Sequence, residues 1–317
     1  MKKLVSLALV LMMVLCALPA LAEGPYKVGI CQLAPHEALD NATQGFMDEI
    51  IAQLGEENVV FDLQNAAGEA NTCAQIANTF VNNEVDLILA NATAALQAAA
   101  AATDEIPVLG TSITEYGVAL GLELQDGCVG YNISGTSDLA PLDQQAEMIL
   151  TLFPETKKVG IVYCSAEDNS IYQVNMVKAY LEGKGIEATL YPFADSNDAA
   201  AVTQDACANS DVIYVPTDNT VASNTGIIDN ICQPAGVAVV CGEASTCKGC
   251  GVATLSIDYY ELGRVTGNMA VKILKGEANV GEMPVEYYPN PVAMYNPVIC
   301  DALGINVPAE YVALDME

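Results

Sequence analysis

The same order of strands and helices occurs twice along this chain. The strand-like segments YKVGICQ, NVVFDLQ, DLILA and IPVLG correspond to KKVGIVYC, EATLYPF, DVIYV and VAVVC, at offsets of 125 to 131 residues. Helical patterns follow them, such as ALDNATQGFMDEIIAQLG after the first segment and SIYQVNMVKAYLEGKG after its counterpart. Strands that alternate with helices build parallel sheets from right-handed β-α-β units. The repeat therefore predicts an α/β fold of two Rossmann-like lobes with parallel sheets, joined by a hinge, with a ligand cleft between them.

The lobe boundary is expected in the segment 131–141, where the second copy begins. We expect a first lobe of residues 23–136 plus about 260–290. The second lobe is expected to contain 137–259 plus about 291–317. The helical pattern DYYELGRVTGNMAVKILKG should cross back to pack on the first lobe, and the Pro/Gly-punctuated segment after it leads to a terminal strand and short helix.

The N-terminal segment MKKLVSLALVLMMVLCALPALA has the pattern of a secretory leader. Lys2 and Lys3 precede an apolar run that ends in a small-x-small triplet at Ala22. This pattern predicts a signal peptide at 1–22, cleavage near Ala22 and an extracytoplasmic location, whether periplasmic, cell-surface or secreted. Two alternatives are an uncleaved membrane anchor and a lipoprotein acylated at Cys16, although Leu15 stands where lipoprotein signals have a small residue. No later apolar run has membrane-spanning length.

The charge of the chain limits its partners. The formal net charge is −29, and removal of the two leader lysines makes the rest more negative still. Such a chain repels nucleic acid and anionic lipid, so neither is an expected partner. With 52% hydrophobic residues the chain is not disordered. We expect a soluble monomer.

Ten cysteines remain after removal of the leader, in a compartment where disulfides persist. Cys232, Cys241, Cys247 and Cys250 lie close together in sequence, and a zinc site would need them to converge. Disulfides or buried free thiols are favoured over zinc, and their pairing is open. The C-x-x-C lies in a Gly-rich turn rather than at a helix N-terminus, which disfavours a redox motif. No metal and no cofactor are expected.

Enzyme signatures do not occur in the sequence. We find no Walker loop, G-x-G-x-x-G, G-x-S-x-G or H-E-x-x-H. His36 is the only histidine, so any nucleophilic triad would have to use it. A binding protein is therefore expected rather than an enzyme, and a secreted α/β hydrolase is the less favoured alternative.

Polar segments that follow the strands are the expected binding site. Ligands of open parallel sheets bind beyond the carboxyl ends of the strands, against helix N-termini. For each single residue, plain helix capping is the competing interpretation. The candidate ligand-binding residues are Gln32, His36, Asp40, Thr93, Thr114, Tyr116, Thr136, Ser137, Glu167, Asn169, Ser170, Asp218, Asn219, Glu243 and Asp258.

The chemistry of these segments suits a zwitterion. Hydroxyls with exposed N–H groups at helix starts bind anions. An uncompensated carboxylate such as Asp218 needs a cationic partner. We expect Asp218, helped by Asn219, to bind an α-ammonium group. Thr93, Thr136 and Ser137 are expected to bind an α-carboxylate.

Several of these segments are familiar. VPTDNTVAS, SAEDNS, GTSD, DYYELG and GNMAVKILKGE together resemble the tryptophan/tyrosine-type ABC-transporter substrate-binding proteins, over essentially the whole chain after the leader. The resemblance implies the type I periplasmic-binding-protein fold, with two lobes joined by three crossings. It also implies a receptor that closes on a small solute, typically an aromatic amino acid, and delivers it to an ABC permease. A sensor module for a signalling receptor is an alternative that the sequence does not separate from transport.

Position by position, the loop with Gln32, His36 and Asp40 resembles the family's first-lobe ligand loop. The family's Thr-Pro-Ala-Ala-Gln helix start occurs here as TAALQ from Thr93, and its Thr-Asp-Pro segment as TEY from Thr114 to Tyr116. The second-lobe motifs match without change. The resemblance thus implies that binding of the ligand's α-amino and α-carboxylate groups is retained, and that the ligand side chain lies against the 32–36 loop and Tyr116.

Overall fold

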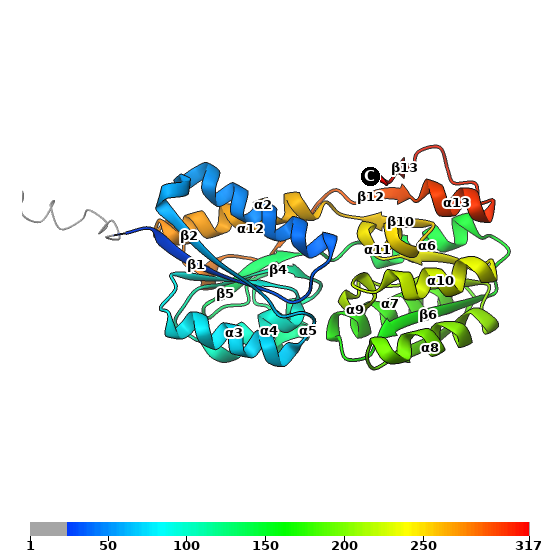
Figure 1. The fold of residues 1–317 in the computed structure, drawn as a ribbon, viewed down its shortest axis with the longest axis horizontal. Helices are drawn as coiled ribbons and strands as arrows, with labels where there is room; N and C mark the ends of the chain where they lie inside the picture. Colours follow the sequence, from blue (N-terminus) through cyan, green and yellow to red (C-terminus); the bar gives the residue numbers. More distant parts are fainter. Residues whose placement is uncertain (1–23, 317) are drawn as a thin grey trace, which may run out of the picture.

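The computed structural model describes residues 24–316, so the predicted leader, its cleavage site and Cys16 lie outside the described residues. Two lobes lie side by side along the long axis of the molecule (Figure 1). The first contains β1 (Tyr26–Gln32), α2 (Glu37–Leu54), η1 (Glu56–Asn58), β2 (Val59–Asn65), α3 (Ala70–Asn82), β3 (Leu87–Asn91), α4 (Thr93–Ala102), β4 (Val108–Ile113), α5 (Tyr116–Leu120), β5 (Ile133–Ser137), α12 (Tyr259–Leu274), η2 (Val280–Glu282) and β11 (Glu286–Tyr287). The second contains α6 (Leu142–Leu152), β6 (Lys158–Cys164), α7 (Asp168–Gly183), β7 (Glu187–Phe193), α8 (Ser196–Asn209), β8 (Val212–Val215), α9 (Asn219–Ala222), α10 (Thr225–Ala235), β9 (Ala238–Cys241), α11 (Ala244–Cys250), β10 (Ala253–Ser256), β12 (Val292–Tyr295), α13 (Pro297–Leu303) and β13 (Val312–Ala313).

The two sheets repeat one topology. The first has the strand order β11-β5-β4-β3-β1-β2 and the second β13-β12-β10-β9-β8-β6-β7. In both, the first strand of the copy lies between its second and third strands, and the fourth and fifth follow outward. The pairs are parallel except for β10 with β12. The predicted α/β fold with two parallel sheets is confirmed.

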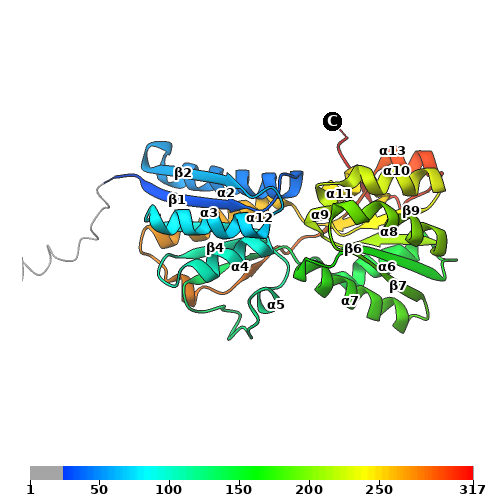
Figure 2. The same ribbon diagram turned by 60° about the horizontal axis from the view of Figure 1, so that its bottom comes forward.

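Helices cover both faces of each sheet. In the first lobe α3 and α4 pack on one face, while α2 and α12 pack on the other (Figure 2). The central strands β3 and β8 are buried along their whole length, as expected of strands covered on both faces. The second sheet has α6 and α7 on one face and α8, α10 and α11 on the other. No helix within 24–316 is long and apolar enough to cross a membrane.

Three connections join the lobes, at 138–141, 257–258 and 288–291. The first two are tied together by Asp138. Its carboxylate accepts hydrogen bonds from Thr114 Oγ1 at 3.1 Å and from Tyr259 OH at 2.9 Å. Burial and the Glu243 carboxylate raise the pKa of Asp138 to about 6, against the effect of these hydrogen bonds. The hinge thus contains a buried, hydrogen-bonded acid.

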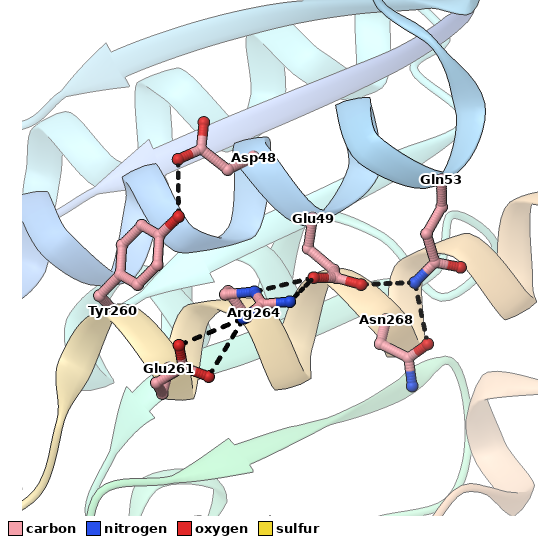
Figure 3. A network of polar contacts seen from close by, with 7 residues as sticks. All are labelled: Asp48, Glu49, Gln53, Tyr260, Glu261, Arg264 and Asn268. Atoms are coloured by element: carbon pink, nitrogen blue, oxygen red, sulfur yellow. Dashed lines mark hydrogen bonds and ion pairs between the residues drawn. The ribbon is translucent and has the colours of Figure 1, made fainter.

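The second connection leads directly into α12, which packs closely on α2. A Cβ atom on Gly45 would lie 2.0 Å from Tyr260 O, and one on Gly263 would lie 2.0 Å from Ala42 O. Only glycine therefore permits this approach of the two backbones. On the exposed side, Tyr260 OH donates to Asp48 at 2.9 Å and Arg264 pairs with Glu49 at 2.9 Å (Figure 3). Because α2 begins at the cleft, this contact fixes its N-terminus relative to the hinge.

Candidate ligand-binding cleft

A cavity of about 510 Å³ lies between the lobes, a size typical of small-molecule sites. First-lobe residues line it from the loop after β1, the loop after β2 and the start of α4. Second-lobe residues line it from the loops after β6, β7 and β8. The lining residues are Leu33, Ala34, Pro35, Ala67, Gly68, Glu69, Ala70, Ala94, Cys164, Ala166, Glu167, Ala194, Asp195, Ser196, Asn219, Thr220, Ser223 and Asn224. The cavity is therefore at the carboxyl ends of both sheets, where parallel sheets bind ligands.

Asp218 is held rigidly behind the second-lobe wall. Its side chain is 1% exposed and caps α9, accepting from Val221 N at 2.9 Å. The other carboxylate oxygen accepts from Cys164 N at 2.7 Å and from Ser170 Oγ at 2.8 Å. Asp218 is thus a helix cap, and it is also a buried negative charge one residue away from Asn219, which lines the cavity.

Glu167 lies in the cavity wall itself. One carboxylate oxygen accepts from the backbone N and Oγ1 of Thr220 at 2.8 and 2.7 Å. The other accepts from the backbone N and Nδ2 of Asn219 at 3.0 and 2.7 Å, and from Asn169 Nδ2 at 3.2 Å. This acid therefore organises α9 from the cleft side.

The two carboxylates form an uncompensated acidic pair. None of the ion pairs found among residues 24–316 involves Glu167 or Asp218. Burial, together with the charge of Glu167, raises the pKa of Asp218 to about 7. A cation in front of the pair would stabilise both ionised carboxylates. This wall of the cavity is thus suited to a positively charged group.

Polar contacts span the cleft between the lobes. His36 Nε2 lies 3.2 Å from Asn219 Oδ1, and Gln97 Nε2 donates to Asp168 Oδ2 at 2.9 Å. Since Asn219 Nδ2 donates to Glu167, its Oδ1 is directed to the first lobe. The second ring nitrogen of His36, Nδ1, is buried without a hydrogen-bond partner. His36 therefore reaches across the cleft to the second lobe.

The first-lobe wall presents a helix N-terminus without a side-chain cap. Ala92 occupies the N-cap of α4 with a φ of 89° and offers no side-chain acceptor. Thr93 is the first residue of the helix and Ala94 lines the cavity. N–H groups at such a helix start attract anions. This edge of the cavity has the opposite electrostatic character to the Glu167 and Asp218 wall.

Several predicted site residues have their polar groups occupied away from the cavity. Tyr116 OH donates to Gly110 O and Thr136 O, at 3.0 and 3.1 Å. Thr136 Oγ1 lies 2.8 Å from Thr266 Oγ1, which ties β5 to α12. Ser137 Oγ donates to Thr114 O at 3.0 Å. The structure does not bring these four residues to the cavity; they join β4, β5, α12 and the hinge.

Gln32 shapes the loop after β1. It is buried, and its amide donates to Ala34 O at 2.9 Å and to Asp40 Oδ1 at 2.6 Å. Its Oε1 accepts from Thr43 Oγ1 at 2.7 Å. Gln32 and Asp40 therefore position the loop 33–36 rather than line the cavity.

Glu243 and Asp258 line a separate cavity of about 360 Å³. Glu243 caps α11, accepting from the backbone N–H groups of Ser245 and Thr246, and Asp258 caps α12, accepting from Glu261 N at 3.0 Å. The structure thus separates these two acids from the wall formed by Glu167 and Asn219. Asn169 and Ser170 lie behind that wall, bonded to Glu167 and Asp218.

Some lining residues lie outside the list of candidate residues. Thr220 and Ser223 belong to the VPTDNTVAS segment, and Asn224 directly follows it. The polar character of this segment after a strand is therefore the sequence signal that could have identified them. Glu69, Asp195 and Ser196 follow β2 and β7, two strands whose ends hold none of the candidate residues. The rule that ligands meet the ends of strands applies equally to them.

Two parallel-sheet lobes with a cavity between their carboxyl ends define a class, the solute-binding proteins of the type I periplasmic-binding-protein fold. Residues 27–316 match the family model described as ABC transporter substrate binding protein. The chain therefore belongs to this family. Its members bind solutes and are not enzymes, and they act outside the cytoplasm.

Individual relatives are similar along most of the chain. A curated tyrosine-binding protein from Clostridioides difficile (strain R20291) is 34% identical over 264 residues, which are 82% of this chain and 75% of the relative. An ABC domain from Streptococcus pneumoniae in complex with L-Trp has 31% identity and a TM-score of 0.87, covering 91% and 99% of the two chains. A ligand-free, open substrate-binding protein with adhesive properties from Clostridium difficile has 34% identity and a TM-score of 0.71, covering 92% and 100%.

Proposed function

We propose that this protein captures an aromatic amino acid, tyrosine or tryptophan, and delivers it to the membrane permease of an ABC importer. The observation that carries the proposal is the acidic pair formed by Glu167 in the cavity wall and Asp218 behind it, opposite an uncapped helix N-terminus. A zwitterion matches both walls at once. The ligands named for the similar tyrosine-binding protein and for the L-Trp complex support the aromatic class.

The α-ammonium group would bind at the second-lobe wall. Glu167 and Asn219 line the cavity there, and Asp218 adds negative charge from behind. This assignment gives the raised pKa of Asp218 a function, because the ligand's ammonium would restore the ionised form. Asn169 and Ser170 hold the two acids in place.

The α-carboxylate would bind at the start of α4. The first-turn N–H groups of that helix, with Thr93, are the donors that this wall offers. The ligand side chain would lie against the apolar loop Leu33-Ala34-Pro35, which Gln32 and Asp40 shape. The cavity volume accommodates an aromatic amino acid.

Binding would close the two lobes about the hinge. The structure has a higher TM-score with the L-Trp complex than with the ligand-free, open protein, although the open protein has the higher sequence identity. Contacts across the cleft, such as His36 with Asn219, are those that a closed form gains. A permease that recognises the closed form then selects loaded protein. We propose a monomer as the active unit.

A thermal-shift screen of the twenty amino acids, followed by calorimetry, tests the proposed ligand class. L-tyrosine or L-tryptophan should raise the melting temperature, and the other aromatic amino acids should raise it by less. Stabilisation by a sugar or a nucleoside, with no response to any amino acid, would contradict the proposal.

A further inference from the structure

Two thiols in the second lobe face each other across a helix pair. Cys207 on α8 and Cys232 on α10 have their Sγ atoms 3.1 Å apart. Both residues lie near the C-terminal ends of helices that pack side by side on one face of the sheet. A disulfide has an S–S bond of about 2.0 Å, so a small adjustment of the side chains would join the two sulfurs.

The two thiols differ in access and acidity. Cys207 is half-buried, whereas Cys232 is 1% exposed. The hydrogen bond between them lowers the pKa of Cys207, while it raises the pKa of Cys232 together with burial. A partly exposed thiol with a lowered pKa is the one that attacks an external disulfide.

We propose that Cys207 and Cys232 form a disulfide bond in the extracytoplasmic compartment. The Cys207 thiolate attacks one sulfur of an external disulfide, such as glutathione disulfide, and displaces the other sulfur as a thiolate. Cys232 then loses its proton and attacks Cys207 Sγ, displacing the second external thiolate. In total the protein loses two protons and two electrons, and the external disulfide is reduced to two thiols.

The other buried cysteines are less exposed than Cys207. Cys31, Cys73, Cys164, Cys241, Cys247 and Cys250 are all 2% exposed or less and Cys300 is 4% exposed, so none of them presents an accessible thiol as Cys207 does. Cys128 is half-buried, but its thiol donates to Glu282 O at 3.6 Å. Cys128 is therefore a matched control of similar exposure.

The bond would strengthen the wall of the cleft. Helix α8 begins at its cap Asp195, and α10 begins at its cap Asn224; both caps line the ligand cavity. A covalent link near the other ends of these helices fixes the two caps relative to each other. It also closes a loop in the unfolded chain between positions 25 residues apart.

Peptide mapping tests the pairing directly. Protein purified with reduced thiols is incubated with glutathione disulfide while folded, then unfolded, alkylated and digested. No Lys or Arg lies between Lys184 and Lys248, so trypsin leaves both cysteines in one peptide. Cleavage at acidic residues is needed, since Asp211, Asp218 and Asp229 separate the two. The expected product is a linked pair of peptides carrying Cys207 and Cys232, two hydrogens lighter than the free pair. Cys241 lies on the same peptide as Cys232, and fragmentation should locate the alkyl label on Cys241. Alkylation of both residues, or linkage of either to another cysteine, would overturn the proposal.

Thermal unfolding gives a second readout. Oxidation should raise the melting temperature of the wild type by about 5–10 °C. The shift should vanish in Cys207→Ser and persist in Cys128→Ser. If oxidised Cys207→Ser keeps the full shift, another pair carries it and the assignment is wrong. The mapping on wild-type protein decides the matter even if a variant folds poorly.

Discussion

His36 of the first lobe and Asn219 of the second meet across the cleft, with Nε2 and Oδ1 3.2 Å apart. Asn219 is in turn held by Glu167, so the contact connects the first-lobe loop to the acidic wall of the cavity. In the proposed closure of the lobes, this pair forms only in the closed state and so contributes to ligand affinity without touching the ligand.

A double-mutant cycle on this contact is the first prediction. His36→Ala and Asn219→Ala should show a coupling free energy of about 0.5–1.5 kcal/mol in ligand affinity, the usual range for one hydrogen bond. Calorimetric dissociation constants of the four proteins give this value. The exposed pair Gln97 and Asp168 is a control that should couple more weakly. Strictly additive effects of His36→Ala and Asn219→Ala would contradict the role of this contact.

Ligand binding should release a proton through Asp218. In the free protein the pKa of Asp218 is raised to about 7, and a bound ammonium would lower it. Affinity should therefore rise as the pH increases from about 5 to about 7.5. Calorimetry at pH 6 in buffers of different ionisation enthalpy measures the released protons.

Asp218→Asn should abolish this proton release and lose about 2–5 kcal/mol of affinity, because the acidic pair is reduced to one charge. Asp205→Asn, on the exposed surface of α8, should leave both quantities unchanged. If the folded Asp218→Asn protein binds the ligand with normal affinity, Asp218 acts only as a helix cap and not in ligand binding.

Asp138 should make the hinge sensitive to pH. The pKa of this acid is raised to about 6 in the fold against about 3.8 in the unfolded chain. Its contribution to stability is therefore present below about pH 4 and is lost as the pH rises through about 6.

Urea denaturation of wild type and Asp138→Asn tests this sign. The free energy of unfolding of the wild type should fall relative to the variant between pH 4 and pH 7, by up to about 3 kcal/mol. The amide can still bond the hydroxyls of Thr114 and Tyr259, so the variant should fold. A difference between the two proteins that does not change with pH would refute the assignment.

The contact of α2 with α12 should not tolerate a methyl group. Gly263→Ala places a Cβ 2.0 Å from Ala42 O, so the helices must separate. A loss of about 2–4 kcal/mol in the free energy of unfolding is expected. Gly183→Ala, at the end of α7 with open space around its Cβ position, is the matched control and should be neutral or slightly stabilising. Equal behaviour of the two variants would show that the contact is looser than the structure indicates.

The two-lobe architecture could be predicted from the sequence because whole strands and helices recur in the same order in both halves of the chain. A buried strand such as DVIYV followed by a polar segment and a helix is predictable from local periodicity alone. The second-lobe wall followed from the same reasoning, since Glu167 and Asn219 directly follow strands.

The first-lobe side of the site was harder to predict because its residues have long-range partners. Tyr116 begins α5 after β4 and Thr136 lies near the end of β5, yet their hydroxyls bond to α12 and to β4 and β5. Whether a threonine at a strand end faces the cleft or a neighbouring helix depends on a helix more than 100 residues away. Similarly, the burial of Asp218 behind Glu167 depends on how α9 turns, and no local pattern specifies that.

The requirement for an α-ammonium group is the central claim, and calorimetry with matched ligands tests it most directly. L-tyrosine and L-tryptophan are titrated into the protein, and each is compared with its N-acetyl derivative, which keeps the side chain and the carboxylate but lacks the positive charge. We predict that at least one free amino acid binds and that its N-acetyl derivative binds at least about 100-fold more weakly. An N-acetyl derivative that binds as tightly as the free amino acid would contradict the account.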